Sequence, residues 1–334
     1  MIPILKIIGI VLSIPFLALV LFYFWASSGS YPQDKYAEII SEESDREQNN
    51  EKDDTFAVVS YNLGYLSGLT NNTAKPRTLE FFEKNLNAVI QALKPLKIDA
   101  IALQEIDLNS QRSFNINQVD KLARGLGMKN HAIAVNWDKN YVPFPYFPFS
   151  AHFGRLLSGQ AILSCYPIQE HDRIVLEKVV DNPFYYNAFY LDRLAQIVRL
   201  KVRDETVILI NVHLEAFDKP TRRKQTQFLQ QLLAKYQEYP ILLMGDFNSP
   251  PPSPEHPQPT ISLLLDLRDL VPVVQSDRLL SQEAKTFPAD DPIAKIDYIF
   301  YSRDRLELLE WRVVREARQA SDHLPLMARF RLIP

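Results

Sequence analysis

Short apolar runs and amphipathic stretches alternate along the chain from Thr55 onward. The runs 56–61 and 98–103 predict strands, and similar runs predict further strands at 159–164, 196–202, 207–212, 241–244 and 296–301. After Pro76, and again after Pro220, apolar residues recur three or four positions apart, which is the spacing of one face of an amphipathic helix. This alternation predicts one large α/β domain over residues 55–334.

The N-terminal pattern is different, because residues 7–25 form a run of 19 residues without a charge. As a helix this run would be roughly 28 Å long, close to the hydrocarbon thickness of a bilayer. We therefore expect a membrane anchor within residues 1–30. Lys6 is the only charged residue before the run, so the N-terminus is predicted to be cytoplasmic and the rest of the chain extracytoplasmic.

Two other interpretations of the N-terminal run remain. The small residues at 26–28 would suit a cleaved signal peptide, although the run is longer than a usual signal core. A helix buried in the protein core is disfavoured because the run has no polar face.

Residues 31–54 carry nine acidic and three basic side chains and few apolar ones. Such a segment cannot bury enough apolar surface to fold, so we expect an acidic disordered linker. The whole chain has a formal charge of −3. Removing the +1 of Lys6 and the −6 of residues 31–54 leaves +2 on residues 55–334, so the predicted domain is mildly basic.

Composition excludes several classes of function. The 46% of hydrophobic residues indicates a packed core. A single cysteine, Cys165, excludes a disulfide framework and a zinc site built on several thiolates. The chain contains no G-x-G-x-x-G, Walker or G-x-S-x-G motif, so the common nucleotide-binding loops and an acyl-serine mechanism have no support.

Polar residues stand where the predicted strands end, the position at which α/β folds place their sites. Their oxygen-rich members suit a hard divalent cation such as Mg²⁺, Mn²⁺ or Ca²⁺. Two histidines among them could supply acid–base chemistry near neutral pH. These candidates are Asn62, Glu105, His213, Asp246, Asn248, Asp297, Asp322 and His323.

The order of the motifs around these residues resembles the endonuclease/exonuclease/phosphatase superfamily, which has the DNase I-like fold. The resemblance covers nearly all of residues 55–334 and implies two packed mixed β-sheets flanked by helices, a four-layer α/β sandwich, here preceded by one transmembrane helix. The matching segments are Ser60-Tyr61-Asn62, Leu103-Gln104-Glu105, Ala161-Ile162-Leu163-Ser164 with Tyr166-Pro167-Ile168, Val212-His213-Leu214, Gly245-Asp246-Phe247-Asn248, Ile296-Asp297-Tyr298-Ile299-Phe300 and Ser321-Asp322-His323-Leu324-Pro325.

The resemblance also implies a role for each candidate. Those expected to hold or position the metal are Asn62, Glu105, Asp246 and Asp322. Those expected to be catalytic are His213, Asp246, Asn248, Asp297 and His323. Asp246 would orient or deprotonate the attacking water, while His323 would act as general base or charge stabiliser with its tautomer fixed by Asp297. Asn248 and Arg193 would contact the substrate phosphate, and His213 would donate to the phosphate or the leaving oxygen.

The predicted function is therefore divalent-metal-dependent hydrolysis of a phosphodiester. The expected anchor and an aromatic, proline-rich loop at 141–153 favour a phospholipid headgroup, in a sphingomyelinase-like reaction, or a related small ester at the membrane. Membrane lipid is the expected partner, and no protein partner is predicted. An extracytoplasmic nuclease is the alternative; it is disfavoured because 222–224 is the only dense basic cluster and the upstream catalytic tyrosine of the nucleases has no counterpart. A catalytically inactive, membrane-anchored binding module ranks lower.

Overall fold

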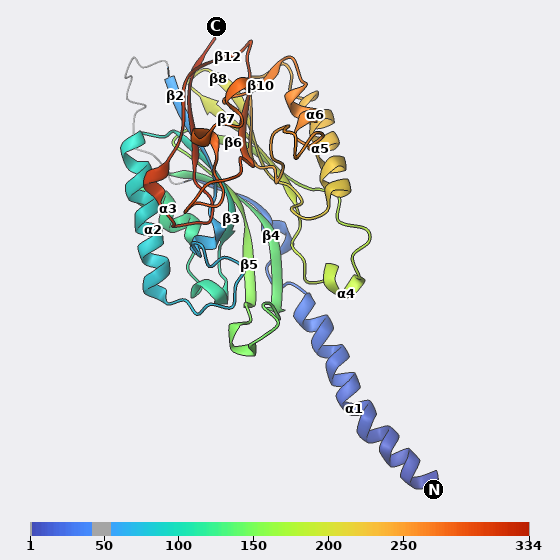
Figure 1. Ribbon diagram of the computed structural model, residues 1–334. Coiled ribbons are helices and arrows are strands. Elements are labelled where there is room, and N and C mark those ends of the chain that lie inside the picture. The colour runs from blue at the N-terminus through green and yellow to red at the C-terminus, as the bar shows by residue number, and fades with distance from the viewer. Residues whose placement is uncertain (1, 42–54, 334) are drawn as a thin grey trace.

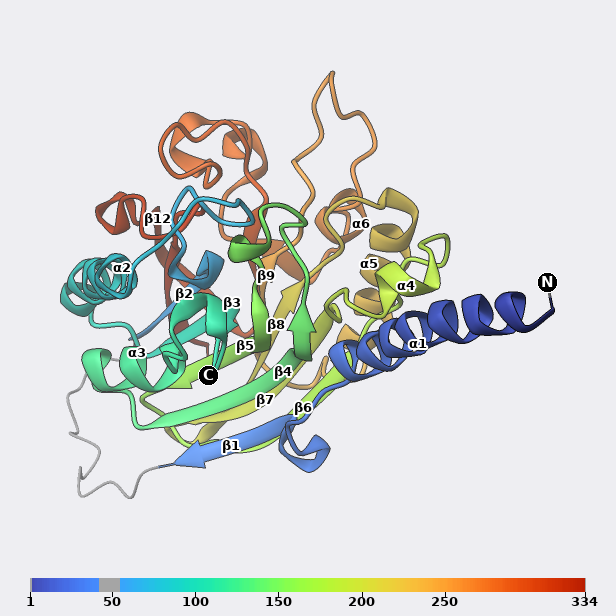
Figure 2. The ribbon, with the colours of Figure 1, turned by 90° about the horizontal axis from the view of Figure 1, so that it is seen from below.

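The computed structural model describes residues 2–41 and 55–333, with side chains from residue 13 onward. Two mixed β-sheets pack face to face, and helices cover their outer faces (Figures 1 and 2). This arrangement confirms the predicted sandwich of two sheets flanked by helices.

The first sheet has seven strands in the order β1-β4-β5-β3-β2-β13-β12. Its central strands β2 and β3 are parallel, and the other neighbours are antiparallel. The strand bounds are β1 Ala37–Ser41, β2 Thr55–Asn62, β3 Ala100–Asp107, β4 Asn130–Val142, β5 Gly154–Ser164, β12 Leu306–Val313 and β13 Leu326–Leu332.

The second sheet has six strands in the order β10-β11-β9-β8-β7-β6. Here β8 and β9 form the parallel pair, so the carboxyl ends of these two strands lie at the same edge. The strand bounds are β6 Ile168–Val175, β7 Leu194–Val202, β8 Glu205–His213, β9 Ile241–Asp246, β10 Leu270–Pro272 and β11 Asp297–Ser302.

Helices α2 (Leu79–Leu93) and α5 (Lys219–Leu233) follow the two predicted amphipathic patterns, and α3 (Gln118–Leu126) and α6 (Ser262–Leu265) were not predicted. α2 and α3 cover the first sheet, and α5 and α6 lie on the opposite side of the molecule (Figure 1). Thr78 and Asp218 cap the first turns of α2 and α5 by accepting backbone hydrogen bonds, as short polar side chains do at helix N-termini. The apolar faces of α2 and α5 close the outer layers of the core.

Three polar side chains between the sheets fix their mutual position next to the strand ends. Gln104 on β3 donates to Asn211 Oδ1 on β8 (2.7 Å), and Asn211 donates to Gln196 Oε1 on β7 (3.0 Å). All three residues are buried. Buried amides specify one alignment because any other would leave them unpaired. Gln104 precedes Glu105 and Asn211 lies two residues before His213, so this alignment also positions the candidate site.

The N-terminal segment forms helix α1 (Ile2–Ser27), which extends away from the sandwich (Figures 1 and 2). Within the part of the chain whose side chains are described, no helix is both long and apolar enough to cross a bilayer. The predicted transmembrane helix is therefore not supported, and residues 7–12 of the predicted span lie outside that part.

The prediction of a disordered linker over residues 31–54 is wrong for its first part. Residues 37–41 form β1, which pairs antiparallel with β4 at the edge of the first sheet. Asp138 on β4 anchors this segment, because its Oδ2 accepts from the Tyr31 backbone N–H and from the Tyr36 hydroxyl, both at 2.9 Å. The high acid content concealed a short edge strand, which can carry charge on its solvent-facing side. Residues 42–54 lie outside the described part of the chain.

Candidate active site

Side chains from both sheets meet where the central strands end. Asn62 ends β2, His213 ends β8 and Asp246 ends β9. In the second sheet His213 and Asp297 are the register partners of Asp246 on its two sides. The predicted strand-end residues therefore come together because neighbouring strands stop at the same level.

The backbone is adapted to this meeting at two positions. Gly245 has φ +149°, and a Cβ there would lie 1.9 Å from the Val212 carbonyl oxygen, so only glycine lets β9 approach β8 so closely. Glu105 has φ +50° and lies where the pairing of β3 with β5 shifts register between Leu103 and Ile106. Such an irregularity re-aims a side chain, and non-glycine residues at positive φ recur at functional sites.

Asp246 is at the centre of the cluster. Its Oδ2 accepts from Asn62 Nδ2 (3.0 Å) and lies 3.5 Å from His213 Nε2 and 3.8 Å from His323 Nε2. Its Oδ1 accepts from the Asn248 backbone N–H (2.8 Å). Burial raises the pKa of Asp246 to about 7, against the opposing effect of the His323 charge. Asp246 can therefore take up and release a proton near neutral pH.

His323 and Asp297 form a buried pair. Asp297 Oδ2 lies 3.0 Å from His323 Nδ1 and also accepts from the Thr286 hydroxyl, and the Phe287 ring packs against the imidazole. Burial lowers the pKa of His323, but Asp297, with further help from Asp246 and Asp322, outweighs it and raises the pKa to about 10. His323 is therefore a cation at neutral pH, with Nε2 facing Asp246.

Glu105 and Asp322 form a second acidic group, and sequence reasoning missed the residue that joins them. Asn71 Nδ2 donates to Glu105 Oε2 (2.9 Å) and to Asp322 Oδ2 (3.3 Å). Burial and the nearby Asp322 charge raise the pKa of Glu105. Asn71 lies in the irregular segment between β2 and α2, where its sequence surroundings carry no strand-end or motif signal.

His213 and Arg193 complete the cluster. His213 Nε2 lies 3.8 Å from Glu105 Oε1, and burial with the Arg193 and His323 charges keeps its pKa well below the usual value, so it is neutral. Arg193 lies next to Leu194, the register partner of His213. It is buried, donates to the Tyr190 hydroxyl (3.2 Å) and leaves Nη1 without a partner among the described residues. A buried, incompletely bonded guanidinium suits an anionic ligand.

The side chain of Asn248 lies differently from its predicted role. Its Nδ2 donates to the Leu214 carbonyl (3.0 Å), so this amide bonds the backbone after β8. The remaining predicted residues converge around Asp246, and three of them, Asp246, Asp297 and His323, place one ligand atom each within 4.8 Å of one another.

The cluster fits a divalent cation by the chemistry of its donors. The carboxylates of Glu105 and Asp322 share the neutral Asn71 amide, and His213 Nε2 lies 3.8 Å from Glu105 Oε1 and 3.5 Å from Asp246 Oδ2. Buried like charges are costly, which explains the raised pKa values of Glu105 and Asp246. Oxygen donors of this kind are the ligands that Mg²⁺, Mn²⁺ and Ca²⁺ prefer.

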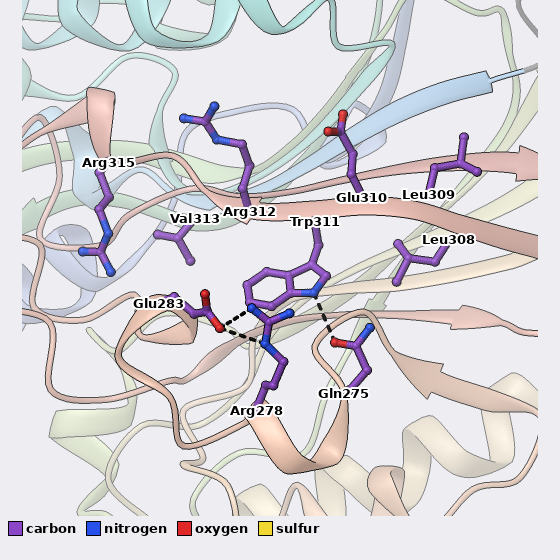
Figure 3. A pocket seen from close by; sticks show the side chains of 10 residues that line it. All are labelled: Gln275, Arg278, Glu283, Leu308, Leu309, Glu310, Trp311, Arg312, Val313 and Arg315. Atoms are coloured by element: carbon purple, nitrogen blue, oxygen red, sulfur yellow. Dashed lines mark hydrogen bonds and ion pairs between the residues drawn. The ribbon is translucent and has the colours of Figure 1, made fainter.

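A separate cavity of about 440 Å³ lies between the 275–283 segment and β12 (Figure 3). None of the predicted site residues lines it. Its Arg278 is bonded to Glu283 and lies over the Trp311 ring, with 5.1 Å between Cζ and the ring centroid. Among the described residues neither histidine nor aspartate lines this cavity, so it has no counterpart of the carboxylate–imidazole cluster.

Comparisons with known proteins agree with the geometry. The sequence model of the endonuclease/exonuclease/phosphatase family matches residues 59–323. No curated protein is significantly similar to the chain in sequence. Solved structures with a similar fold include an endonuclease/exonuclease/phosphatase from Beutenbergia cavernae (TM-score 0.60, 16% identity, covering 83% of this chain and 72% of that one). Others are the human Nocturnin catalytic domain with a bound sulfate anion (0.58, 17%, 91% and 100%) and a mannosyl-6-phosphatase from Bacteroides thetaiotaomicron (0.56, 17%, 84% and 100%).

Proposed function

Because the chain belongs to the endonuclease/exonuclease/phosphatase family, we propose that it is a divalent-metal-dependent phosphodiesterase that acts on phospholipid headgroups. The observation that carries the phosphoesterase part is the buried Asp246, which contacts both imidazoles of the cluster. Hydrolysis of a phosphate ester needs a base for water, a cationic partner for the phosphate and a site for a metal ion. The cluster around Asp246 offers all three.

Glu105, Asp322 and Asp246 would hold the cation, which would neutralise charge that develops on the phosphate. Asn71 and Asn62 orient these carboxylates through their amide nitrogens. The metal identity is part of the proposal, with Mg²⁺ as the first candidate and Mn²⁺ and Ca²⁺ as the others.

The protein's own side chains divide the proton chemistry. Asp246, which lies near both imidazoles, is placed to accept the proton of the attacking water. His323 stays protonated because of Asp297, and therefore stabilises negative charge through Nε2 instead of acting as the base. Neutral His213 and the partly unpaired Arg193 lie on the other side of Asp246, where they can donate hydrogen bonds to phosphate oxygens.

The lipid part of the proposal is supported by an aromatic surface, which we define as Tyr146, Phe147, Phe149 and Phe184. Each side chain is at least 66% exposed, although large apolar side chains are costly to leave in water. The last turns of α1 adjoin this surface, since the Tyr23 ring packs on Phe184. The Phe22 ring packs on Tyr141, which lies at the end of β4. Aromatic side chains beside an apolar helix are typical of proteins that contact the membrane interface.

We also retain the membrane location as a proposal, with the N-terminus cytoplasmic and the catalytic domain extracytoplasmic. The uncharged run at 7–25 and the position of Lys6 support it. Protease digestion of intact and of permeabilised cells tests the orientation. Degradation of the domain only after permeabilisation would contradict it.

The substrate is tested by offering the purified full chain two kinds of phosphodiester, lipid vesicles and plasmid DNA, with Mg²⁺. We expect release of a phosphorylated headgroup from vesicles of sphingomyelin and phosphatidylcholine, and no cutting of plasmid DNA. Digestion of the plasmid with intact vesicles would replace the lipid proposal by the nuclease alternative. If neither the vesicles nor the plasmid is hydrolysed with Mg²⁺, Mn²⁺ or Ca²⁺, the phosphodiesterase proposal itself is contradicted.

A further inference from the structure

A cavity of about 290 Å³ adjoins the cluster on the side of α4 (Phe184–Asn187). Three aromatic rings and three carboxylates line it, and no lysine or arginine of the described chain does. These six lining residues are Tyr186, Tyr190, Phe217, Asp181, Glu215 and Asp218. A cavity with this lining favours a cation that also presents apolar surface.

Two of the lining residues connect the cavity to the candidate phosphate site. Glu215 follows His213 by two residues, and its carboxylate accepts from the Tyr190 hydroxyl at 3.3 Å. Arg193 bonds this same hydroxyl and lies 3.5 Å from Glu215, while its Nη1 is unpartnered among the described residues. A phosphate held by Arg193 would therefore place its substituent at the mouth of the cavity.

The charges of the cavity do not cancel. Arg193 offsets Glu215 through their 3.5 Å ion pair. Asp218 accepts hydrogen bonds from Thr221 that keep its pKa low, so it stays charged, and Asp181 adds a further carboxylate. Of the cations nearby, Lys224 is paired with Glu177 at 2.6 Å. Arg222, which donates to the Glu215 and Ala216 carbonyls, offsets one further carboxylate, so three carboxylates face two guanidinium groups. The lining is thus negative in sum, which disfavours anionic substituents.

The aromatic wall determines which cation fits. Tyr186 and Tyr190 stack with ring centroids 5.4 Å apart and planes at 27°, and Phe217 adds a third, 85% exposed ring. A trimethylammonium group spreads its charge over methyl groups, sheds water at lower cost than a primary ammonium and needs no hydrogen-bond acceptor. The aromatic faces suit its methyl groups, and the nearby carboxylates suit its positive charge.

We propose that this cavity binds the quaternary ammonium of a choline phosphoester, so that the substrate is a choline headgroup. This inference rests on the proposed phosphodiesterase function and names its substrate class. The neutral hydroxyls of glycerol or inositol headgroups would bring no positive charge to the carboxylates.

Two soluble phosphodiesters of equal shape test the charge preference. One is p-nitrophenyl phosphocholine, and the other is p-nitrophenyl 3,3-dimethylbutyl phosphate, in which carbon replaces the ammonium nitrogen. The purified full chain, in maltoside detergent with Mg²⁺, is expected to hydrolyse the choline ester with a kcat/KM about tenfold higher, as cation–π contact implies.

The Tyr186→Leu variant is expected to lower this ratio to about two, because it removes one ring of the wall. Tyr185→Leu is the matched control, since Tyr185 lies on the same short helix, is 58% exposed and does not line the cavity. The control should keep the wild-type ratio. Both esters are measured on each preparation, so partial unfolding cancels in the ratio.

Equal kcat/KM values for the two esters, or a ratio unchanged by Tyr186→Leu, would overturn the choline inference while the phosphodiesterase proposal stands. Absence of hydrolysis of both esters would instead reject the phosphodiesterase proposal. In that case calorimetric titration with phosphocholine and with 3,3-dimethylbutyl phosphate decides the inference. Binding of phosphocholine no tighter than its uncharged isostere would overturn it.

Discussion

The carboxylate of Asp297 lies 3.0 Å from Nδ1 of His323 inside the protein, and this contact keeps the imidazole charged. Changing Asp297 to Asn preserves the shape but removes the charge. We expect hydrolysis to fall about 10²- to 10⁴-fold, since the proposed charge stabiliser loses its proton. The wild-type His323 pKa of about 10 should drop, so the variant loses its remaining activity at a lower pH as the pH rises.

The pH dependence of kcat for the wild type and the Asp297→Asn variant is the corresponding measurement. Thr286→Val serves as comparison, because Thr286 only donates a hydrogen bond to Asp297, and its effect should be smaller. Equal rates and equal alkaline limbs in the wild type and the Asn variant would contradict the assigned role of the pair.

Metal affinity should depend on pH because protons compete for the ligands. Asp246 has a pKa raised by burial to about 7, and the pKa of Glu105 is raised as well. Their charged forms bind the cation, so below about pH 7 the apparent Mg²⁺ affinity should fall by about tenfold per pH unit or more. Calorimetric titration from pH 5.5 to 8 measures this. Affinity that does not change over that range would exclude Asp246 as a ligand.

Removal of one proposed ligand gives an independent check. Glu105→Gln keeps the hydrogen-bonding shape but deletes a charge, and should weaken Mg²⁺ binding at pH 7.5 by at least about tenfold. Glu205→Gln, at the exposed start of β8, is a matched control with unchanged affinity. Full Mg²⁺ affinity of the Glu105 variant would show that this carboxylate does not hold the metal.

The contact between β8 and β9 at Gly245 makes a prediction about stability. A Cβ at this position would meet the Val212 backbone oxygen, which cannot move without disturbing both strands. Gly245→Ala should lower the free energy of unfolding by at least about 3 kcal/mol. Gly127 also has a positive φ, but a Cβ at this position would lie in open space. Gly127→Ala should therefore lower the free energy of unfolding by only ~1 kcal/mol. Urea denaturation of both variants measures the difference, and equal losses would contradict this explanation.

The aromatic surface is tested through binding to vesicles. Replacing both Phe147 and Phe149 by Ser removes two largely exposed rings and should reduce the vesicle-bound fraction at least about tenfold. The control is Leu280→Ser with Ile293→Ser, two exposed apolar side chains outside this surface. Sedimentation with phosphatidylcholine vesicles measures binding. An equal loss in both double variants would show that these two rings have no special role.

Much of this architecture was predictable because the central strands are short buried apolar runs. Asn62, His213 and Asp246 were found from sequence because each ends such a run and belongs to a motif of the family. Other features depend on contacts that no local pattern encodes. β1 was missed because it lies at the start of a segment, residues 31–54, that carries nine acids, and because its pairing depends on Asp138, about a hundred residues away.

The same distinction applies within the site. Asn71 and Thr286 lie in loops, and only the folded chain brings them to Glu105 and Asp297. Asn248 had a motif, yet its amide bonds the Leu214 carbonyl. A motif therefore indicates which residues meet, whereas the direction of each side chain is set by the packing around it.

The central claim is that the cluster around Asp246 is a metal-dependent phosphodiesterase site. Its most direct test is hydrolysis of bis-p-nitrophenyl phosphate by the full chain with Mg²⁺, with EDTA, and as the Asp246→Ala and His323→Ala variants. We predict hydrolysis with Mg²⁺ that EDTA abolishes and that each substitution lowers by at least about 10²-fold. Hydrolysis at the wild-type rate in both variants would contradict the claim.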